Sequence, residues 1–537
     1  MRLGVDFGTT RVVVAAVGRG NYPVVSFKGP NGAGRDWFPP LIAVRGGERR
    51  YGWQAWAAQT ETGWTIVRSL KRILGDCAPD APIQIADQAL PLHQLLREML
   101  AAFKADLCAR SSLSLSKGEP LETMLGVPAN ANSNQRFLTM EAFREAGFQV
   151  LGLLNEPSAA SIEFGQRPTR PNECILIYDL GGGTFDASLV EMDGLTHLVT
   201  GTEGIASLGG DDFDEILGEL AMDAAGITES EREDLSQAEL FRLQELGRQN
   251  KEALHPNSRR IPFDLAQVRS GWPSVSVRME DFSACCRPLI DQTLQMVEGL
   301  LFKHGIALER PPGDGIRPGQ RLEAVYMTGG GSELPLVSAT VRKCFGHRAR
   351  RAARARSATA IGLALRADAQ AGYGIRERLP RHFGVWREAD GGMRICFDAV
   401  FTKDTLLPGP GEPSLFSRRC YSPVHNIGHF RFLECSHISP AGPPTGDITA
   451  WDEIRFPFDP ALKRQMDLTS FPVIHSAAAA RQQIEESYEY EASGIVTVAL
   501  ANRTAGYQRD YRLKKSGAPL DPVKPVKKIR RKASKDS

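Results

Sequence analysis

Two short segments of the chain carry the same set of chemical groups, and that set suits the binding of phosphate. Asp6 precedes a turn with one glycine and two threonines, and Asp179, 173 residues later, precedes a turn with three glycines and one threonine. Glycine lacks Cβ and tolerates positive φ, so its backbone N–H can approach a phosphate oxygen closely. Each aspartate places a carboxylate at a strand end, where it can help to position a hydrated Mg²⁺. We predict that the two turns face each other and hold a polyphosphate between them.

The elements around the two turns follow one plan. Leu3, Val5 and Phe7 alternate with other residues before the first turn, and a β-branched run follows at 12–17. Residues 175–179 and 185–190 repeat this pattern of strand, turn and strand, which predicts two β-hairpins in a duplicated α/β unit. Helices are expected from their apolar spacing at 92–107, directly after the two glycines at 209–210, and from near residue 281. Alternating strands and helices indicate an α/β class.

The pattern of secondary-structure signals in the sequence changes near residue 370. We predict a nucleotide-binding α/β domain over 1–370, a linker over 371–380, a β-sandwich over 381–515 and a disordered basic tail over 516–537. The β-rich part has short strand signals broken by proline and glycine, and we expect a long amphipathic helix there only at about 477–488.

Composition limits the class of protein. The chain has 537 residues, of which 42% are hydrophobic and 24% charged, so it is not mainly disordered, collagenous or coiled-coil. No apolar stretch approaches about 18 residues and no secretory signal is evident. Nine scattered cysteines suggest reduced thiols, and we expect a cytoplasmic protein without a membrane partner. The net charge is +2. Residues 514–537 carry nine basic and two acidic residues, a net of +7, which leaves −5 for the rest.

Both turns resemble the phosphate loops of the actin, sugar-kinase and 70-kDa heat-shock protein superfamily. Six segments further resemble the DnaK-type chaperones of the heat-shock branch: 69–75, 127–136, 154–160, 178–186, 208–214 and 327–331. The resemblance covers about 1–370 and implies a two-lobed, actin-like ATPase domain. It extends more weakly to the β-rich part at 379–385, 457–459 and 490–498. The pattern stops where the family continues into a helical lid, so the resemblance implies a variant without a lid.

The resemblance also implies roles for individual residues. Lys71, Glu156, Asp179 and Thr184 would be catalytic, with Lys71 placing positive charge at the γ-phosphate and the attacking water. Asp6 and Asp179 would position Mg²⁺, and Asp186 would complete the water and metal site. Pro128 and Arg136 would form an allosteric switch. Nucleotide contacts are expected from Gly8, Thr9, Thr10, Gly181, Gly182, Gly183, Thr184, Gly210, Lys251, Gly329, Gly330 and Gly331. The implied cofactors are ATP and Mg²⁺, with K⁺ as a further ion.

Several positions depart from the family pattern. Arg11 follows the two threonines where the family has a small or aromatic polar residue, and Arg248 stands where a glutamate is expected. Glu333 stands where an adenine-facing arginine is expected, and a glutamate cannot stack on a purine as an arginine does. Residues 354–357 and the linker at 373–378 also differ. These changes predict looser ATP binding or altered base selectivity, and they weaken the case for coupling between nucleotide and peptide sites.

The leading interpretation is a chaperone-like ATPase that binds hydrophobic segments of client polypeptides under nucleotide control, with a co-chaperone and a nucleotide-exchange factor as further partners. Candidate peptide contacts are Val385, Tyr421, Phe430 and Phe432, although these residues also suit the core of a sandwich. The alternative is a nucleotide-responsive scaffold with little turnover. The β-rich C-terminal part argues against a filament former or a sugar kinase. The basic tail could bind nucleic acid or another anionic partner.

Overall fold

Two sheets with the same strand order form the frame of the molecule. The computed structural model describes residues 1–68, 70–167, 172–306, 322–389, 394–409, 412–491 and 494–513. The first sheet has the order β11-β10-β1-β2 and the second the order β18-β17-β12-β13-β14-β19. In each, a central strand pairs antiparallel with the strand that follows it in the chain and parallel with a later strand, as β1 does with β2 and β10, and β12 with β13 and β17. The shared order supports the predicted duplication. Their bounds are β1 Arg2–Phe7, β2 Val12–Ala16, β10 Glu122–Val127, β11 Gln149–Asn155, β12 Glu173–Leu180, β13 Phe185–Asp193, β14 Thr196–Ile205, β17 Leu322–Thr328, β18 Ala349–Arg351 and β19 Gly374–Arg376.

Two helices cross between the sheets, and each packs against the sheet of the other half. Helix α4 (Glu156–Phe164) follows the first sheet, yet its Ala160 and Phe164 pack in a buried cluster with strand β12 of the second. Helix α10 (Ala358–Ala367) follows the second sheet, yet it packs against β2 of the first. The helices approach closely because residue 362 is glycine: a Cβ there would lie 1.8 Å from the Ala159 carbonyl oxygen. The two halves therefore share their central packing.

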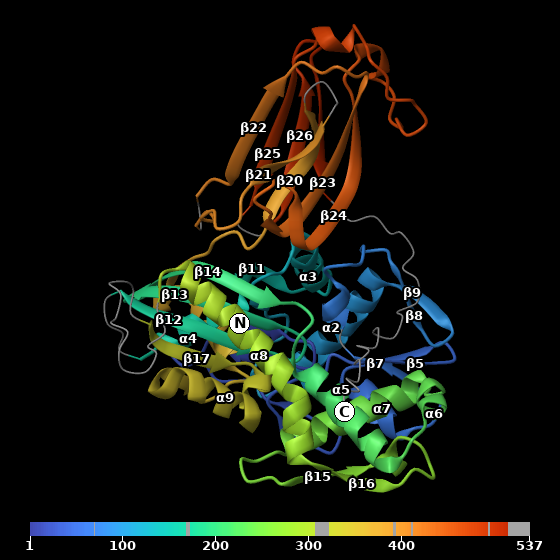
Figure 1. Ribbon diagram of the computed structural model, residues 1–537, viewed down its shortest axis with the longest axis vertical. Helices are drawn as coiled ribbons and strands as arrows, with labels where there is room; N and C mark the ends of the chain where they lie inside the picture. Colours follow the sequence, from blue (N-terminus) through green and yellow to red (C-terminus); the bar gives the residue numbers. More distant parts are fainter. Residues whose placement is uncertain are drawn as a thin grey trace, which may run out of the picture.

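Further helices and small sheets cover the outer faces of the two halves (Figure 1). The predicted helices are confirmed as α2 (Leu92–Ala109), α5 (Gly210–Ala225) and α8 (Met279–Lys303), whose apolar faces lie in the two largest buried clusters. The remaining helices are α1 Trp53–Ala57, α3 Ser133–Glu145, α6 Glu229–Glu233, α7 Gln237–Glu252 and α9 Pro335–Phe345. The smaller sheets contain β3 Phe27–Lys28, β4 Gly34–Arg35, β5 Ile42–Arg45, β6 Glu48–Tyr51, β7 Thr65–Val67, β8 Pro82–Ile85, β9 Gln88–Pro91, β15 Arg260–Asp264 and β16 Ser274–Arg278.

The C-terminal part contains two four-stranded antiparallel sheets around one hydrophobic core, with the orders β21-β20-β23-β24 and β22-β25-β26-β27. Their bounds are β20 His382–Ala389, β21 Arg394–Phe401, β22 Leu415–Tyr421, β23 Ile427–Ile438, β24 Pro444–Pro457, β25 Ile484–Tyr490, β26 Val496–Asn502 and β27 Tyr507–Arg512. The helix predicted at about 477–488 is wrong. Only a single 3₁₀ turn forms at Ala479–Arg481, and the segment then continues as β25, paired on both sides.

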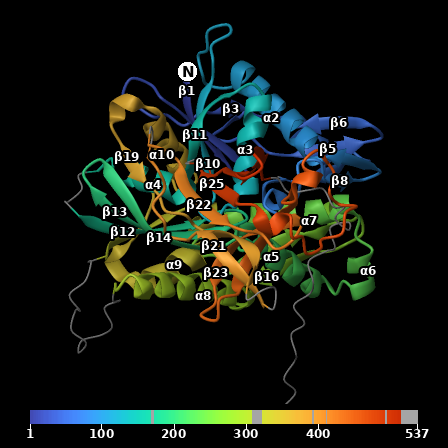
Figure 2. The same ribbon diagram turned by 90° about the horizontal axis from the view of Figure 1, so that it is seen from above.

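The segment predicted as a linker joins the second sheet. Residues Gly374–Arg376 form β19, which pairs parallel with β14 at the sheet edge. The C-terminal sheets then lie over α3 of the first half and also contact the second half, where Lys403 pairs with Glu203 of β14 at 3.0 Å (Figures 1 and 2). No helix in the described part of the chain is long and apolar enough to cross a membrane. The basic tail lies outside the described residues.

Candidate functional site

The structure brings the two glycine–threonine turns together, as predicted. In each turn the first glycine N–H donates to the carbonyl three residues later, at 3.0 Å from Gly8 to Arg11 and from Gly181 to Thr184. A Cβ added to Gly182 would lie 2.9 Å from the Thr10 hydroxyl and 3.0 Å from the Thr9 hydroxyl. The turns therefore face each other at van der Waals contact, and both line one cavity of about 230 Å³.

Buried acidic side chains surround one lysine at the floor of this cavity. Lys71, in the 3₁₀ turn Leu70–Ile73, donates to Glu156 Oε1 at 2.6 Å, and both residues are more than nine-tenths buried. Asp6 is the residue before the last in β1, and Asp179 in β12 lies directly opposite Asp186 in β13. Strands β1, β12 and β13, the start of α4 and the 3₁₀ turn thus bring four carboxylates and Lys71 to the same cavity. Ser69, the neighbour of the lysine segment, lies outside the described residues.

Burial and crowding shift the protonation of these groups. Burial raises the pKa of Asp179 to about 8, and repulsion from Glu156 and Asp186 adds to this shift. Burial and repulsion from Glu156 also raise the pKa of Asp6 and of Asp186, the latter to about 7. For Lys71, burial lowers the pKa, but attraction to Glu156 and Asp6 outweighs it and the pKa is raised. Four carboxylates against one lysine create a site that favours an added cation.

The donor chemistry of this cavity fits Mg²⁺ bound together with phosphate. Mg²⁺ keeps several waters and binds through one or two carboxylates and phosphate oxygens, and its charge would relieve the repulsion among the aspartates. Among the residues that the structure describes, no three acidic, histidine or cysteine side chains lie close enough to hold a metal by themselves. A hydrated ion shared with a ligand is the arrangement that this donor set suits, with Asp6 and Asp179 as its protein contacts.

Two further glycine segments and one lysine lie close to the second turn. Gly210 N–H, at the start of α5, donates to Gly181 O at 2.9 Å, and Lys251 of α7 pairs with Asp214 of α5 at 2.7 Å. Gly329 has φ +78°, and a Cβ there would lie 2.3 Å from the carbonyl oxygen of Leu180. The cavity is lined by Gly210, Lys251, Gly329, Gly330 and Gly331, whereas Gly183 instead packs on Thr9 and Arg72.

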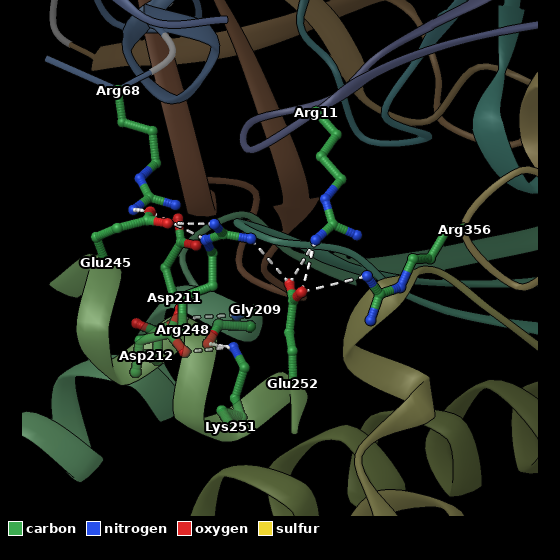
Figure 3. Close-up of polar contacts among 12 residues, drawn as sticks. Arg11, Arg68, Gly209, Asp211, Asp212, Glu245, Arg248, Lys251, Glu252 and Arg356 are labelled. Atoms are coloured by element: carbon green, nitrogen blue, oxygen red, sulfur yellow. Dashed lines mark hydrogen bonds and ion pairs between the residues drawn. The ribbon is translucent and has the colours of Figure 1, made fainter. Parts of the chain in front are cut away.

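A network of charged residues around Glu252 also lines the cavity (Figure 3). Glu252, the last residue of α7, pairs with Arg11 at 2.6 Å, Arg248 at 3.2 Å and Arg356 at 3.3 Å. Arg356 also pairs with Glu333 at 2.6 Å, so the glutamate noted in the sequence is engaged by a neighbouring arginine. Burial raises the pKa of Glu252, but the three arginines outweigh it and lower the pKa to about 2.

Sequence reasoning singled out Arg11, Arg248 and Glu333 as departures but missed Glu252, their centre. One signal was available: Arg248 and Glu252 are four residues apart on one helix, the spacing of a helical ion pair. The other partners of Glu252 come from distant parts of the chain, 241 residues away for Arg11 and 104 for Arg356.

The predicted switch residues lie between the cavity and the C-terminal sheets. Pro128 lines the cavity, and Ala131 N–H donates to its carbonyl at 3.0 Å. Arg136 is buried on α3 and donates from Nε to Ala131 O at 3.2 Å and from Nη2 to Asn155 Oδ1. Asn155 N–H in turn donates to Glu377 Oε1 at 3.0 Å. A continuous chain of hydrogen bonds therefore leads from the cavity wall to the segment before the C-terminal sheets.

The C-terminal sheets contact the same helix directly. Glu434 of β23 accepts hydrogen bonds from the backbone N–H (3.2 Å) and hydroxyl (2.5 Å) of Ser133, the first residue of α3. Asn132, the N-cap of that helix, donates to the Thr449 hydroxyl at 3.0 Å. A carboxylate at a helix N-terminus is favoured by the orphan N–H groups and the helix dipole. Burial nevertheless raises the pKa of Glu434.

The four candidate peptide contacts divide into two groups. Val385 and Phe432 are at most 2% exposed and lie in the core between the C-terminal sheets, which was the alternative reading of these residues. Phe430 is also largely buried, but together with Tyr421 it lines a second cavity, of about 710 Å³, in this part of the chain. Exposed Ile395, Val424 and Val473 line the same cavity.

The duplicated sheets, the crossed helices and the facing turns define a two-lobed protein with an actin-like fold. Comparison with known proteins narrows this class. The family model described as Hsp70 protein matches residues 2–377. Chaperone protein HscA of Pectobacterium atrosepticum is 31% identical over 429 residues, which cover 76% of this chain and 64% of the relative. Chaperone protein HscA homolog of Pseudomonas fluorescens is 29% identical over 539 residues, which cover 96% of this chain and 78% of the relative. The chain belongs to the Hsp70 family. It spans 64% of the length of the first of these relatives.

Proposed function

We propose that the chain is an ATP-dependent chaperone that binds ATP with Mg²⁺ between the two turns and hydrolyses it slowly. The observation that carries this proposal is the convergence in one cavity of both turns, the Lys71–Glu156 pair and the three aspartates. Lys71 is placed to stabilise negative charge on the transferred phosphoryl group, the main task in this chemistry. Glu156 and Thr184 would orient the attacking water, and the bound Mg²⁺ would supply charge neutralisation at the phosphates. K⁺ is a further ion that the site could bind.

The second part of the proposal is that the nucleotide controls the C-terminal sheets, which would form a β-sandwich for client polypeptides. Its support is the hydrogen-bond path through Pro128, Arg136 and Asn155 to Glu377, together with the contact of Glu434 with α3. A change at the cavity wall moves the same helix on which the sheets rest. The segment at 373–378 thus makes a polar connection to the first half through Glu377.

Client binding is proposed at the cavity lined by Tyr421 and Phe430. Exposed apolar side chains at this cavity, such as Ile395 (56% exposed) and Val424 (51%), would contact an extended hydrophobic segment. Apolar pockets beside strands are a recurrent way of binding extended peptides. Further proposals are a cytoplasmic location, a co-chaperone and an exchange factor as partners.

The test is steady-state ATP hydrolysis by the full chain and by Lys71→Ala. We expect the variant to lose at least 100-fold in rate while it still binds Mg·ATP, because removing one charge-stabilising group costs roughly 10²–10³ in kcat. Exposed Lys117→Ala is the matched control and should hydrolyse ATP as the wild type does. Equal background rates in all three proteins, with ATP bound, would instead identify a nucleotide-responsive scaffold.

A further inference from the structure

The charged network around Glu252 determines what the adjacent part of the nucleotide cavity can recognise, given the nucleotide site proposed above. Glu252 Oε1 accepts from Arg11 at 2.8 Å and from Arg248 at 3.2 Å, and Oε2 accepts from Arg11 at 2.6 Å and from Arg356 at 3.3 Å. A carboxylate has about four lone-pair sites, so this one is filled. Glu252 therefore has no acceptor left for a ligand.

Hydrogen-bond donors, in contrast, are in surplus. Each guanidinium has five N–H groups. Arg11 spends only Nη2 on Glu252, and its Nε is buried without a hydrogen-bond partner in the described structure. Arg356 uses Nε for Glu333 at 2.6 Å and Nη1 for Glu252, and its Nη2 makes none of the hydrogen bonds described. The arginines on this wall thus have hydrogen-bond donors to spare, whereas Glu252 between them has no remaining acceptor.

These groups belong to the cavity that holds the phosphate turns. Arg11, Glu252 and Arg356 line it together with Thr10 and Gly182. Because these arginines and the phosphate turns line one cavity, the base of a nucleotide held by the turns would meet this wall. Arg11 is also fixed from its other side by the ring of Trp37, 4.9 Å from the guanidinium carbon. Burial lowers the pKa of Arg11 to about 10, which leaves it charged at pH 7.

Purine bases differ at the edge that such a wall would meet. Guanine presents two acceptors, O6 and N7, which suit guanidinium N–H groups, whereas adenine presents one acceptor, N7, beside an amino donor. A wall of donors satisfies the first edge and opposes the amino group of the second. We propose that the cleft takes 6-oxopurine nucleoside triphosphates, those of guanosine and inosine, at least as well as ATP, through donors of Arg11 and Arg356.

The test is calorimetric titration of the full chain, in the presence of Mg²⁺, with ATP, GTP and ITP. We expect GTP and ITP to bind with a Kd equal to or below that of ATP, and ITP to match GTP because the 2-amino group is not read. ATP binding 10-fold or more tighter than GTP overturns this inference and leaves the proposed function standing. Absence of binding by all three overturns the proposed function, and the inference falls with it.

A matched pair of variants tests the wall itself. Arg356→Gln replaces a donor-only group by an amide that both donates and accepts, so GTP and ITP should weaken about 10-fold while ATP changes less than 3-fold. Arg354→Gln, at an exposed position two residues away that does not line the cavity, should leave all three affinities unchanged. Retained ATP binding shows that the variant is folded. If Arg356→Gln loses as much affinity for ATP as for GTP, Arg356 does not donate a hydrogen bond to the edge of the base, and the inference is refuted.

Discussion

Replacing Asp179 by asparagine should stabilise the nucleotide-free protein at pH 8 while it abolishes Mg·ATP binding. Burial, with repulsion from Glu156 and Asp186, raises the pKa of this carboxyl from 3.8 to about 8. The folded chain therefore holds a proton that the unfolded chain releases above about pH 4, and the stability contributed by that proton is lost as pH rises towards 8. Asparagine has nearly the same shape and cannot ionise, so the variant escapes this loss.

The magnitude follows from the shift. At about 1.4 kcal/mol per pKa unit, a shift from 3.8 to about 8 corresponds to roughly 5–6 kcal/mol. Asp6, Asp179 and Asp186 interact electrostatically, so their titrations are coupled and replacing one of them recovers only part of this free energy. We assign about 2 kcal/mol of unfolding free energy to the single substitution. The melting temperature of the variant should then exceed that of the wild type by about 3–6 °C at pH 8.

The assay is thermal unfolding of both proteins, without nucleotide, between pH 5 and pH 8. We expect a clearly smaller difference in melting temperature at pH 5 than at pH 8, because the stability loss of the wild type begins near the unfolded pKa of 3.8 and is complete only near the folded pKa of about 8. Mg·ATP should raise the melting temperature of the wild type alone. Exposed Asp87→Asn serves as the control and should show no pH-dependent difference. An advantage of Asp179→Asn that is the same at both pH values would refute the electrostatic reasoning.

Three further outcomes test other parts of the structure. Gly182→Ala places a Cβ 2.9–3.0 Å from Thr9 and Thr10 and should weaken ATP binding at least 30-fold, because it forces the turns apart. The control Gly299→Ala, on α8 with open space around it, should bind ATP as the wild type does. Calorimetry measures both affinities, and similar values for the two variants would contradict the packing of the turns. Glu434→Gln weakens the contact of the C-terminal sheets with α3, so ATP should change the rate of peptide release from this variant less than 2-fold while ATP affinity stays constant. Stopped-flow fluorescence measures peptide release. An effect of ATP as large as in the wild type would exclude transmission through the Glu434 contact. Val424→Asp should reduce peptide affinity about 10-fold without changing the melting temperature. The control Phe416→Asp, exposed but outside the second cavity, should leave peptide affinity unchanged. Equal peptide affinities of the two variants in fluorescence anisotropy would show that clients do not bind at this cavity.

Local patterns predicted the turns and the strands that carry them. The alternation before Gly8 and the second glycine run depend on neighbours in sequence, so the hairpins and the approach of Asp6 to Asp179 could be anticipated from duplication. The role of Glu252 could not, because Arg11 and Arg356 reach it only after both halves have folded around α7. Spacing in sequence contains no record of such contacts.

The wrongly predicted helix shows a different limit. Residues 477–480 are four alanines, which have the highest intrinsic helix propensity, and mixed polar residues follow. In the fold, Ile484 and Tyr488 enter the core between the C-terminal sheets, and β22 and β26 supply backbone partners on both sides. Tertiary pairing outweighed local preference, and only one 3₁₀ turn of the expected helix remains.

Helices α4 and α10 cross where the backbone at Gly362 lies directly against the backbone at Ala159. We expect any rotation of one half against the other to centre on this close contact, because the two halves share their packing there. Glu156 starts the helix that passes through this contact, and Asn155, which holds Glu377, directly precedes it. A small angular motion of the halves around a bound phosphate would therefore be transmitted as a pull on the segment that tethers the C-terminal sheets.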